Sequence, residues 1–333
     1  MKRLIVLLGL CLLAVSPATA QAATALLVGG AGKYHVLTDE DMATAMGGYF
    51  ADYTRVNVAF PGQVNRFKYS VDVGTENLYA AVYATPGPKT IGSVSAGSPV
   101  VYNVLRMLDQ DPNPPSPTEL DAAVYGGISP RWYRGTGVKY QPLPETQYNL
   151  KVVKAEYDGI ADFPDNPFNG LAVMNAVMGG FLLHVQMAYY DISQVPADHI
   201  TVSPPNSRGG VTTTILIPTP VLPLLQPMLD KGADPDRIAE LDAKLRPIVD
   251  RAYKRNQTTT AAKTTTAAEA TEATDAAPAA DRQEPRRARW KDRQAEAAER
   301  RTTRQANRSH PQRPAASSTR RSAGADTADA AGS

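Results

Sequence analysis

Residues Lys89-Thr90-Ile91-Gly92-Ser93-Val94-Ser95-Ala96-Gly97-Ser98-Pro99 contain the pattern that decides the fold. Ser95 has small residues two positions before and after it, Ser93 and Gly97, and an apolar stretch with helical spacing follows over 100–108. A serine flanked in this way is typical of a sharp strand-to-helix turn that holds its hydroxyl above a sheet. Glycine is usual at the first flanking position, and serine is small enough to replace it. Because short patterns also arise by chance, a Ser/Gly turn that merely joins two buried elements is the alternative.

The first 22 residues have the features of a secretory signal peptide. A basic start, Met1-Lys2-Arg3, precedes an apolar run from Leu4 to Val15 that is too short to span a bilayer, and residues 18–22 offer two cleavage sites. A retained membrane anchor is the alternative. Cys11, the one cysteine of the chain, lies inside this segment. The exported protein is therefore expected to have no disulfide and to rely on a hydrophobic core.

The remaining chain changes in composition near residue 255. Residues 21–255 contain 19 Lys and Arg against 23 Asp and Glu, a net charge of −4, whereas residues 256–333 contain 14 against 10, a net charge of +4. A mildly acidic domain lacks the basic surface of nucleic-acid-binding proteins, so we expect no nucleic-acid partner. Residues 256–333 are rich in Thr, Ala, Arg and Glu and poor in large apolar side chains, which is typical of disorder. The sequence thus predicts one domain over 23–255 and a disordered C-terminal tail over 256–333.

Strand-like and helix-like patterns alternate within residues 23–255. Buried-strand patterns occur at 25–28, 55–60, 89–94, 148–157 and 212–217, and helical patterns at 77–84, 100–108, 171–185, 222–229 and 238–253. This alternation predicts an α/β fold, in which helices flank a mostly parallel central sheet. Together with the serine turn at Ser95, it favours an α/β-hydrolase-like arrangement.

The segment from Leu171 to Val185 is the most apolar part of the chain after the signal peptide. Asn175, a pair of glycines at 179–180 and His184 interrupt it, and it is too short to cross a membrane. We expect a helix that belongs to the core or acts as a lid. A helix that lies in a lipid interface is the alternative.

A catalytic serine needs a base, usually a histidine that a carboxylate orients. Among the four histidines, His184 follows both Ser95 and Asp158, an acid placed directly after the predicted strand 148–157. The order Ser95, Asp158, His184 is the chain order of the α/β-hydrolase triad. Asp162, four residues farther along the same loop, is the main alternative acid, and Asp165 is another. A core histidine and an ordinary turn aspartate are the structural alternatives for His184 and Asp158.

Backbone amides near Ser95 are candidates for an oxyanion hole, which stabilises negative charge on a reacting carbonyl. These are the amide of Ala96 and one amide, from Gly30 or Ala31, in the glycine turn after the first strand. The glycine spacing in that turn does not match a dinucleotide fingerprint. Beyond residue 22 the chain has no cysteine, no H-E-x-x-H motif and no close pair of histidines, so we expect neither a metal nor another cofactor.

Several stretches resemble the PE-PPE domain family. The most specific is Tyr157 to Pro164, which contains Asp-x-x-Ala-Asp-Phe-Pro, and the resemblance extends over roughly residues 25–255. Further matching stretches are Pro112–Ile128, Asn166-Pro167, Leu171–Ala176, His184 with Tyr189, Leu222–Pro227 and Leu245–Asp250. Two features depart from the family pattern: Ser93 stands where glycine is usual, and a signal peptide stands where many members carry an N-terminal PE or PPE helical module.

The resemblance implies a member of a mycobacterial and actinobacterial set of α/β-hydrolases similar to cutinases and lipases, with Ser95, Asp158 and His184 as the triad. It implies esterase activity on short- to medium-chain acyl esters, and with the signal peptide a protein that is secreted or held in the cell envelope. An acyltransferase acting on envelope lipids or sugars is one alternative, and a non-catalytic envelope-binding protein is another. The expected partners are an acyl ester or lipid substrate and the envelope surface, and the oligomeric state stays open.

We predict that residues 256–333 are dispensable for folding and catalysis, because their composition cannot bury enough apolar surface to offset the entropy of ordering them. A chain that ends at residue 255 should keep the melting temperature and the ester hydrolysis rate of the longer protein. A large fall in melting temperature on truncation would contradict this prediction.

Overall fold

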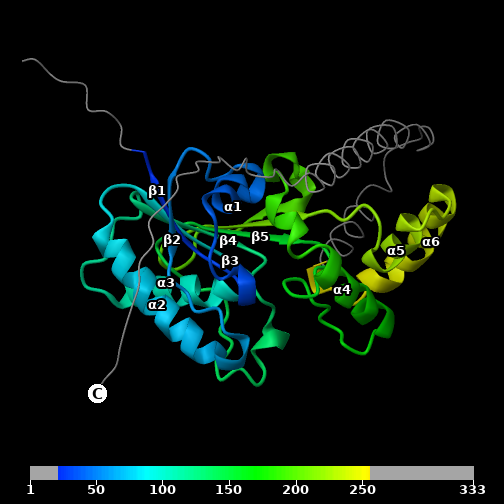
Figure 1. Cartoon of the computed structure of the whole chain (residues 1–333), viewed down its shortest axis with the longest axis horizontal. Coiled ribbons are helices and arrows are strands. Elements are labelled where there is room, and N and C mark those ends of the chain that lie inside the picture. The colour runs from blue at the N-terminus through cyan, green and yellow to red at the C-terminus, as the bar shows by residue number, and fades with distance from the viewer. Residues whose placement is uncertain (1–21, 256–333) are drawn as a thin grey trace, which may run out of the picture. The chain divides into compact units, whose positions relative to one another are not determined.

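The computed structural model describes residues 22–255, so the predicted tail and all but the last residue of the predicted signal peptide lie outside the described residues (Figure 1). Seven strands form within this range: β1 (Thr24–Val28), β2 (Thr54–Val58), β3 (Lys89–Val94), β4 (Leu120–Tyr125), β5 (Leu150–Ala155), β6 (Ile200–Val202) and β7 (Thr212–Ile217). The α-helices are α1 (Asp39–Thr44), α2 (Phe67–Ala84), α3 (Ser98–Gln110), α4 (Gly170–Leu182), α5 (Gln226–Asp230) and α6 (Pro235–Asp250). No helix of the described part is both long and apolar enough to cross a membrane.

The strands form a single sheet in the order β2-β1-β3-β4-β5-β7-β6. All neighbouring pairs are parallel except β6 and β7, which are antiparallel. The carboxyl ends of β1, β3, β4 and β5 therefore meet at one edge, the usual position of a ligand site in an open α/β sheet. The prediction of a mostly parallel central sheet flanked by helices is confirmed.

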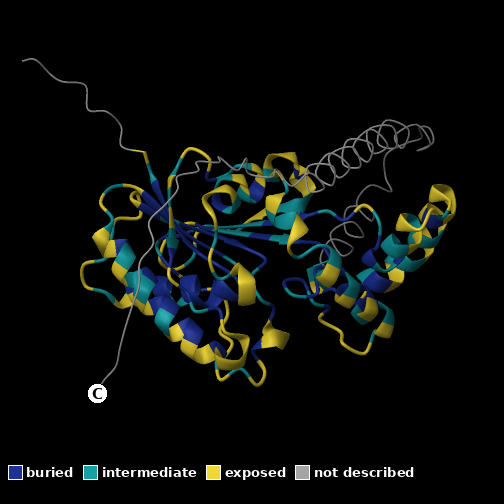
Figure 2. Cartoon of the chain, in the orientation of Figure 1, coloured by how far each residue is buried: buried dark blue, intermediate teal, exposed yellow. Residues whose placement is uncertain are grey.

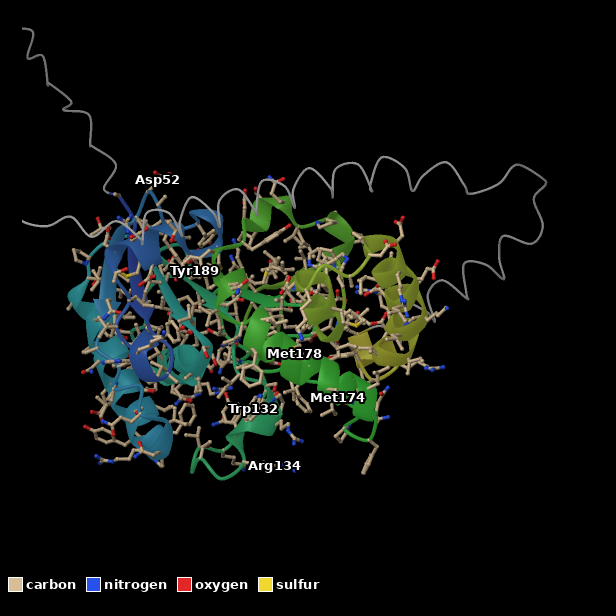
Figure 3. The ribbon with its side chains drawn as sticks, turned by 45° about the vertical axis from the view of Figure 1, so that its right-hand side comes forward. Asp52, Trp132, Arg134, Met174, Met178 and Tyr189 are labelled. Carbon is tan, nitrogen blue, oxygen red and sulfur yellow. The ribbon has the colours of Figure 1, made fainter. Side chains whose placement is uncertain are left out.

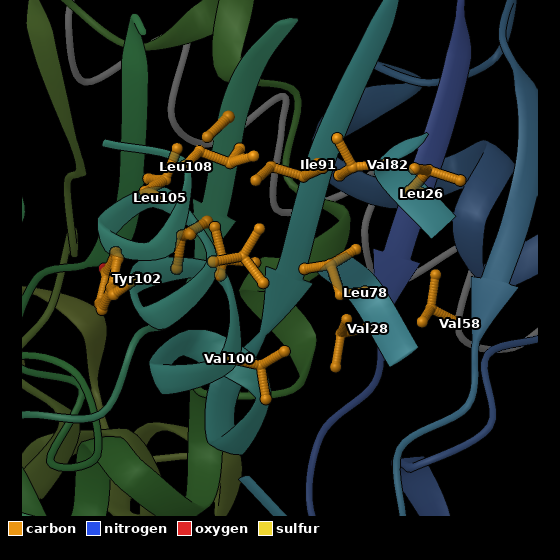
Figure 4. Packing of buried hydrophobic residues seen from close by; sticks show 14 of the residues in the cluster. Leu26, Val28, Val58, Leu78, Val82, Ile91, Val100, Tyr102, Leu105 and Leu108 are labelled. Atoms are coloured by element: carbon orange, nitrogen blue, oxygen red, sulfur yellow. The ribbon is translucent and has the colours of Figure 1, made fainter. Parts of the chain in front are cut away.

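Helices α2 and α3 cover one face of the sheet and form the largest apolar core (Figure 4). Alternate residues of the central strands, such as Leu26, Ile91 and Val124, point to this face, because successive side chains of a strand alternate in direction. They meet apolar residues spaced by three or four positions along the two helices, such as Leu78 and Leu105. Figure 2 shows most residues of these strands as buried.

A second core covers the other face of the sheet. There, Leu27, Tyr125 and Ile215 of the strands pack against Met42 of α1 and Phe50 of the segment after it. A third cluster lies beside the sheet, where α4, α5 and α6 surround Tyr157. Helix α1 therefore contributes to the second core, whereas α4 belongs to the third cluster.

Several elements differ from the sequence-based expectation. β4 and β6 were not predicted: β4 is a central strand buried on both faces, so it lacks polar alternation, and β6 has only three residues. The helix predicted at 77–84 is the last part of α2. The strand predicted to reach Tyr157 ends at Ala155, because Tyr157 turns to a left-handed φ of 61°.

The buried side of α4 consists of small residues, which lets the helix backbone lie very close to the turn after β5. A Cβ atom on Gly179 would lie 2.0 Å from the carbonyl oxygen of Tyr157, and one on Gly159 would lie 2.2 Å from that of Ala176. At both contacts a larger side chain would have to displace backbone rather than a flexible side chain.

We predict that Gly179→Ala lowers the free energy of unfolding by at least about 2 kcal/mol, since its methyl group would overlap backbone. Gly180→Ala is the matched control: the nearest atoms to its Cβ are 3.7 Å away. Alanine is a better helix former than glycine, so this neighbour should be neutral or more stable by up to about 1 kcal/mol. Denaturant unfolding of both variants tests the prediction, and equal stabilities would contradict it.

Candidate active site

Ser95 occupies the sharp turn between β3 and α3, as its flanking small residues predict. Its φ is 52°, a left-handed value that is uncommon for a residue with a side chain. Only glycine fits at position 97, because a Cβ atom there would lie 2.5 Å from the carbonyl oxygen of Gly29. Ser93 is buried, and its hydroxyl has no hydrogen-bond partner within the described residues. The backbone strain at Ser95 is of the kind that clusters at functional sites.

The structure brings Ser95, His184 and Asp158 together. His184 Nε2 lies 2.8 Å from Ser95 Oγ, and His184 Nδ1 lies 2.6 Å from Asp158 Oδ2. The carboxylate of Asp158 accepts a hydrogen bond, so the proton of a neutral imidazole belongs on Nδ1. Nε2 is then free to accept the hydrogen bond of the Ser95 hydroxyl. This arrangement of a nucleophile, a base and an orienting carboxylate is that of a serine triad.

Asp158 is fully buried in the turn after β5. Its second oxygen, Oδ1, accepts a hydrogen bond of 2.9 Å from the amide of Ile160, so both carboxylate oxygens have a partner. A buried carboxylate that is paired and hydrogen-bonded avoids most of the penalty of desolvation. The side chain is thereby held in one orientation toward His184.

Asp162, the alternative acid, is bound to partners other than His184. Its carboxylate contacts Lys154 Nζ at 2.8 Å and Arg255 Nη1 at 2.9 Å, and it accepts a hydrogen bond of 3.0 Å from the amide of Tyr157. Through these contacts Asp162 links Lys154 of β5 and Arg255 to the backbone of Tyr157, the residue with the left-handed φ. Asp162 therefore supports the turn that carries Asp158 and does not replace Asp158.

Two residues at the carboxyl end of β4, which the sequence analysis missed, position His184. The Tyr125 hydroxyl donates a hydrogen bond of 2.9 Å to the carbonyl of His184. Burial, together with the charge of Asp158, raises the pKa of Tyr125 well above its ordinary value, so the hydroxyl stays protonated. Gly126 has a φ of 59°, and a Cβ there would lie 3.0 Å from His184 Cε1. The Tyr-Gly-Gly sequence at 125–127 could have indicated these residues. It does so only once the preceding residues are recognised as a strand that ends next to Ser95 and His184.

The candidate oxyanion amides come from two segments, the turn after β1 and the residue that follows Ser95. A Cβ on Gly30 would lie 3.5 Å from Ser95 Cβ, so the turn after β1 is next to the nucleophile. The Gly30 amide already donates a hydrogen bond of 2.8 Å to the carbonyl of Tyr34. This leaves the amide of Ala31, rather than that of Gly30, as the candidate to act with Ala96.

A cavity of about 730 Å³ opens above this site and has a mainly apolar lining. Ser95 and His184 form part of its wall, and Met42, Phe50 and Ile128 are among its apolar residues. A pocket of this size with a few polar groups is typical of a small-molecule site. Within residues 22–255, no group of three or more His, Cys, Asp or Glu side chains is placed to bind a metal ion.

Comparison with family models gives a match to the PE-PPE domain over residues 52–254, which is more than half of the chain. The chain belongs to the PE-PPE domain family. The matched range contains all three residues of the hydrogen-bonded set, whereas β1 and the turn at Gly30 precede it.

Among curated relatives, three Mycobacterium tuberculosis proteins carry an activity in their names. The chain is 37% identical over 196 residues to SL1278 acyltransferase Chp1, an alignment that covers 56% of this chain and 48% of that protein. It is 32% identical over 205 residues to diacyltrehalose acyltransferase Chp2, covering 56% of this chain and 57% of the relative. It is 30% identical over 207 residues to esterase PE16, covering 57% of this chain and 38% of the relative. The chain thus spans about half the length of the two acyltransferases.

We predict that Asp158→Asn reduces turnover far more than Asp162→Asn. An amide at 158 keeps the shape but cannot stabilise an imidazolium, and the same change in a well-studied serine protease costs about ten-thousandfold. Asp162→Asn should act through stability, with a loss of about 1–3 kcal/mol from weakened buried contacts. Turnover and melting temperature measured for both variants decide the matter, and an inactive but fully stable Asp162→Asn protein would show that the wrong acid has been chosen.

Proposed function

We propose that this protein is a serine esterase, lipase-like in its apolar pocket, that cleaves short- to medium-chain acyl esters through an acyl-enzyme. The hydrogen-bonded set Ser95–His184–Asp158, with distances of 2.8 and 2.6 Å and in the wall of an apolar cavity, carries this proposal. The family and the names of the relatives support ester or acyl chemistry in general. Export by the predicted signal peptide to the exterior or the cell envelope is part of the proposal.

In the first half of the reaction, Ser95 Oγ attacks the ester carbonyl carbon while His184 Nε2 takes the hydroxyl proton. Asp158 stabilises the imidazolium that forms and holds its orientation. The amides of Ala96 and Ala31 donate to the carbonyl oxygen as it becomes negative, and one such donor is worth about 3 kcal/mol. The bond to the leaving alcohol then breaks, and His184 returns the proton to that oxygen.

In the second half, an acceptor hydroxyl attacks the acyl-enzyme while His184 takes its proton. When the acceptor is water, the products are a carboxylic acid and the free Ser95 hydroxyl. The reaction needs no further cofactor, since the protein side chains and backbone supply the base, the nucleophile and the oxyanion donors.

Acyl transfer is the second candidate function, favoured by similarity to two proteins named acyltransferases. It uses the same acyl-enzyme, but an alcohol of an envelope lipid or sugar takes the place of water. Product analysis with a chromogenic acyl ester, with and without an added sugar acceptor such as trehalose, separates the two functions: an acylated sugar indicates transfer, and free acid alone indicates hydrolysis.

We predict that Ser95→Ala lowers turnover of a chromogenic ester by about a thousandfold or more, because loss of the nucleophile removes the covalent route. Ser93→Ala is the matched control, since its buried hydroxyl makes no hydrogen bond within the described residues. That variant should keep turnover within about threefold of the parent and equal or higher stability. Circular dichroism confirms folding of both.

Near-normal turnover in a folded Ser95→Ala protein would refute the assignment of the nucleophile. No hydrolysis or transfer by the parent protein, over a series of acyl chain lengths, would favour the non-catalytic envelope-binding protein.

A further inference from the structure

Helix α4 is unusual because its large apolar side chains point outward. Its buried residues are Ala172, Asn175, Ala176 and Gly179, whereas Met174, Val177 and Phe181 are 67%, 47% and 82% exposed. The close approach to the turn after β5 explains the small residues on the inner side, but it does not require large apolar residues on the outer side. A solvent-exposed helix face normally carries charged or polar residues.

The outward row continues from α4 to the opening of the cavity. Hydrogen bonds from Leu183 N to Gly179 O (2.7 Å) and from Met187 N to Leu183 O (2.8 Å) prolong the helical path beyond Leu182. Val185, one turn after Phe181, is exposed and lines the cavity, as does Tyr189. Exposed apolar side chains therefore lead from the middle of α4 to the site that contains Ser95.

Trp132 extends this surface on the loop beside α4. It is exposed, it lines the cavity, and its Nε1–H donates a hydrogen bond of 2.8 Å to the carbonyl of Gly159. Figure 3 shows Met174 and Met178 on α4, with Trp132 to the left of Met174 and Arg134 below both. We call the surface formed by Met174, Val177, Phe181, Val185, Tyr189 and Trp132 the α4 face.

The polar side-chain atoms of Trp132 and Tyr189, two of the three aromatic residues of the α4 face, form hydrogen bonds to other residues of the protein. Trp132 bonds to Gly159, and the Tyr189 hydroxyl donates a hydrogen bond of 2.9 Å to Asp41. Their rings are thus exposed in fixed positions. Tryptophan and tyrosine placed with an apolar body outward are enriched where proteins meet a membrane interface.

The distribution of charge also distinguishes this surface. Residues 166–190 contain no Asp, Glu, Lys or Arg. The nearest exposed charges along the loop of Trp132 are the cations Arg131 and Arg134, whereas α1, on the other core layer, begins with acidic residues at 39–41. Cations beside an uncharged apolar face suit the phosphate layer of a lipid surface. Asp41 of α1 meets the α4 face at Tyr189, where it accepts the hydrogen bond of that hydroxyl.

We propose that the α4 face docks on a lipid surface, with α4 in the plane of the interface and the cavity opening toward the lipid. Helices of this kind insert their apolar side by about 5–10 Å. A second copy of the chain bound to this face would cover the cavity opening. It would also find no charged side chain on α4 with which to form an ion pair. Docking on lipid instead lets an acyl chain pass from the lipid to the cavity without crossing water, a consequence that rests on the proposed function, whereas the docking itself does not.

The test compares vesicle binding by the chain from residue 23 to its end with that of two double variants. Met174→Gln/Phe181→Gln removes two exposed apolar side chains of the α4 face, and Met107→Gln/Val202→Gln removes two exposed apolar side chains from α3 and β6. Neither pair belongs to the hydrogen-bonded site. Binding is measured by sedimentation with phosphatidylcholine vesicles at physiological salt. Because these vesicles have no net charge and salt screens exposed charges, the basic tail that all three proteins share should contribute little electrostatic attraction.

We expect the α4-face variant to bind vesicles at least about tenfold more weakly than the parent, since two large side chains no longer leave water. The Met107→Gln/Val202→Gln variant should bind like the parent. Hydrolysis of a short, fully dissolved ester and the melting temperature should be the same for all three. Adding anionic phosphatidylglycerol should strengthen binding of the parent, and salt should reverse that increment.

Three results would overturn the proposal: no binding of the parent to vesicles, equal binding by the α4-face variant, or a parent dimer that dissociates in that variant, which would identify a second copy as the occupant. Loss of vesicle binding in the α4-face variant alone, with no ester hydrolysis by any protein, would refute the proposed function and leave the docking surface supported.

Discussion

The close packing of α4 against the turn after β5 determines where the imidazole of His184 lies. Gly179 and Gly159 permit contacts that a single methyl group would obstruct, and His184 follows α4 by two residues. Asp158 lies in the turn after β5, against which α4 packs. One packing constraint therefore positions both His184 and Asp158, and the sharp turn after β3 then needs only to present Ser95 at hydrogen-bonding distance from His184.

The turn after β5 places three buried carboxylates within seven residues, and each has at least one partner. Asp158 pairs with His184, whereas Asp162 pairs with Lys154 and Arg255, and Glu156 lies 3.8 Å from Arg246 and 3.7 Å from Arg255, so that Arg255 is shared by these last two carboxylates. Burial raises the pKa of Glu156, and the two arginines oppose that rise. Buried charges are tolerated when they are paired and hydrogen-bonded, and removal of one partner is costly. The surrounding ion pairs thus allow the turn to hold Asp158 rigidly at full burial.

The outer and inner sides of α4 have different roles. Its inner side is small because the turn with Asp158 lies against it, and its outer side carries the exposed apolar residues that reach the cavity. Substitutions on the two sides should therefore have separable effects, on stability and catalysis at the inner side and on lipid contact at the outer side. The family match covers this whole unit, from before α2 to after α6.

Local physical chemistry was sufficient to predict much of this protein from its sequence. The small residues around Ser95 indicate a strained turn, the β-branched runs indicate strands, and the order Ser95, Asp158, His184 indicates a triad, because each signal depends on neighbours in the chain. The tertiary structure decided what depends on distant residues. It selected Asp158 over Asp162, since only the packing of α4 shows which carboxylate reaches the imidazole across 26 residues. It assigned the Gly30 amide to the carbonyl of Tyr34 and left the amide of Ala31 as the candidate. It also placed Tyr125 next to His184 through β4, a strand whose short and mostly apolar sequence does not distinguish it from other buried segments.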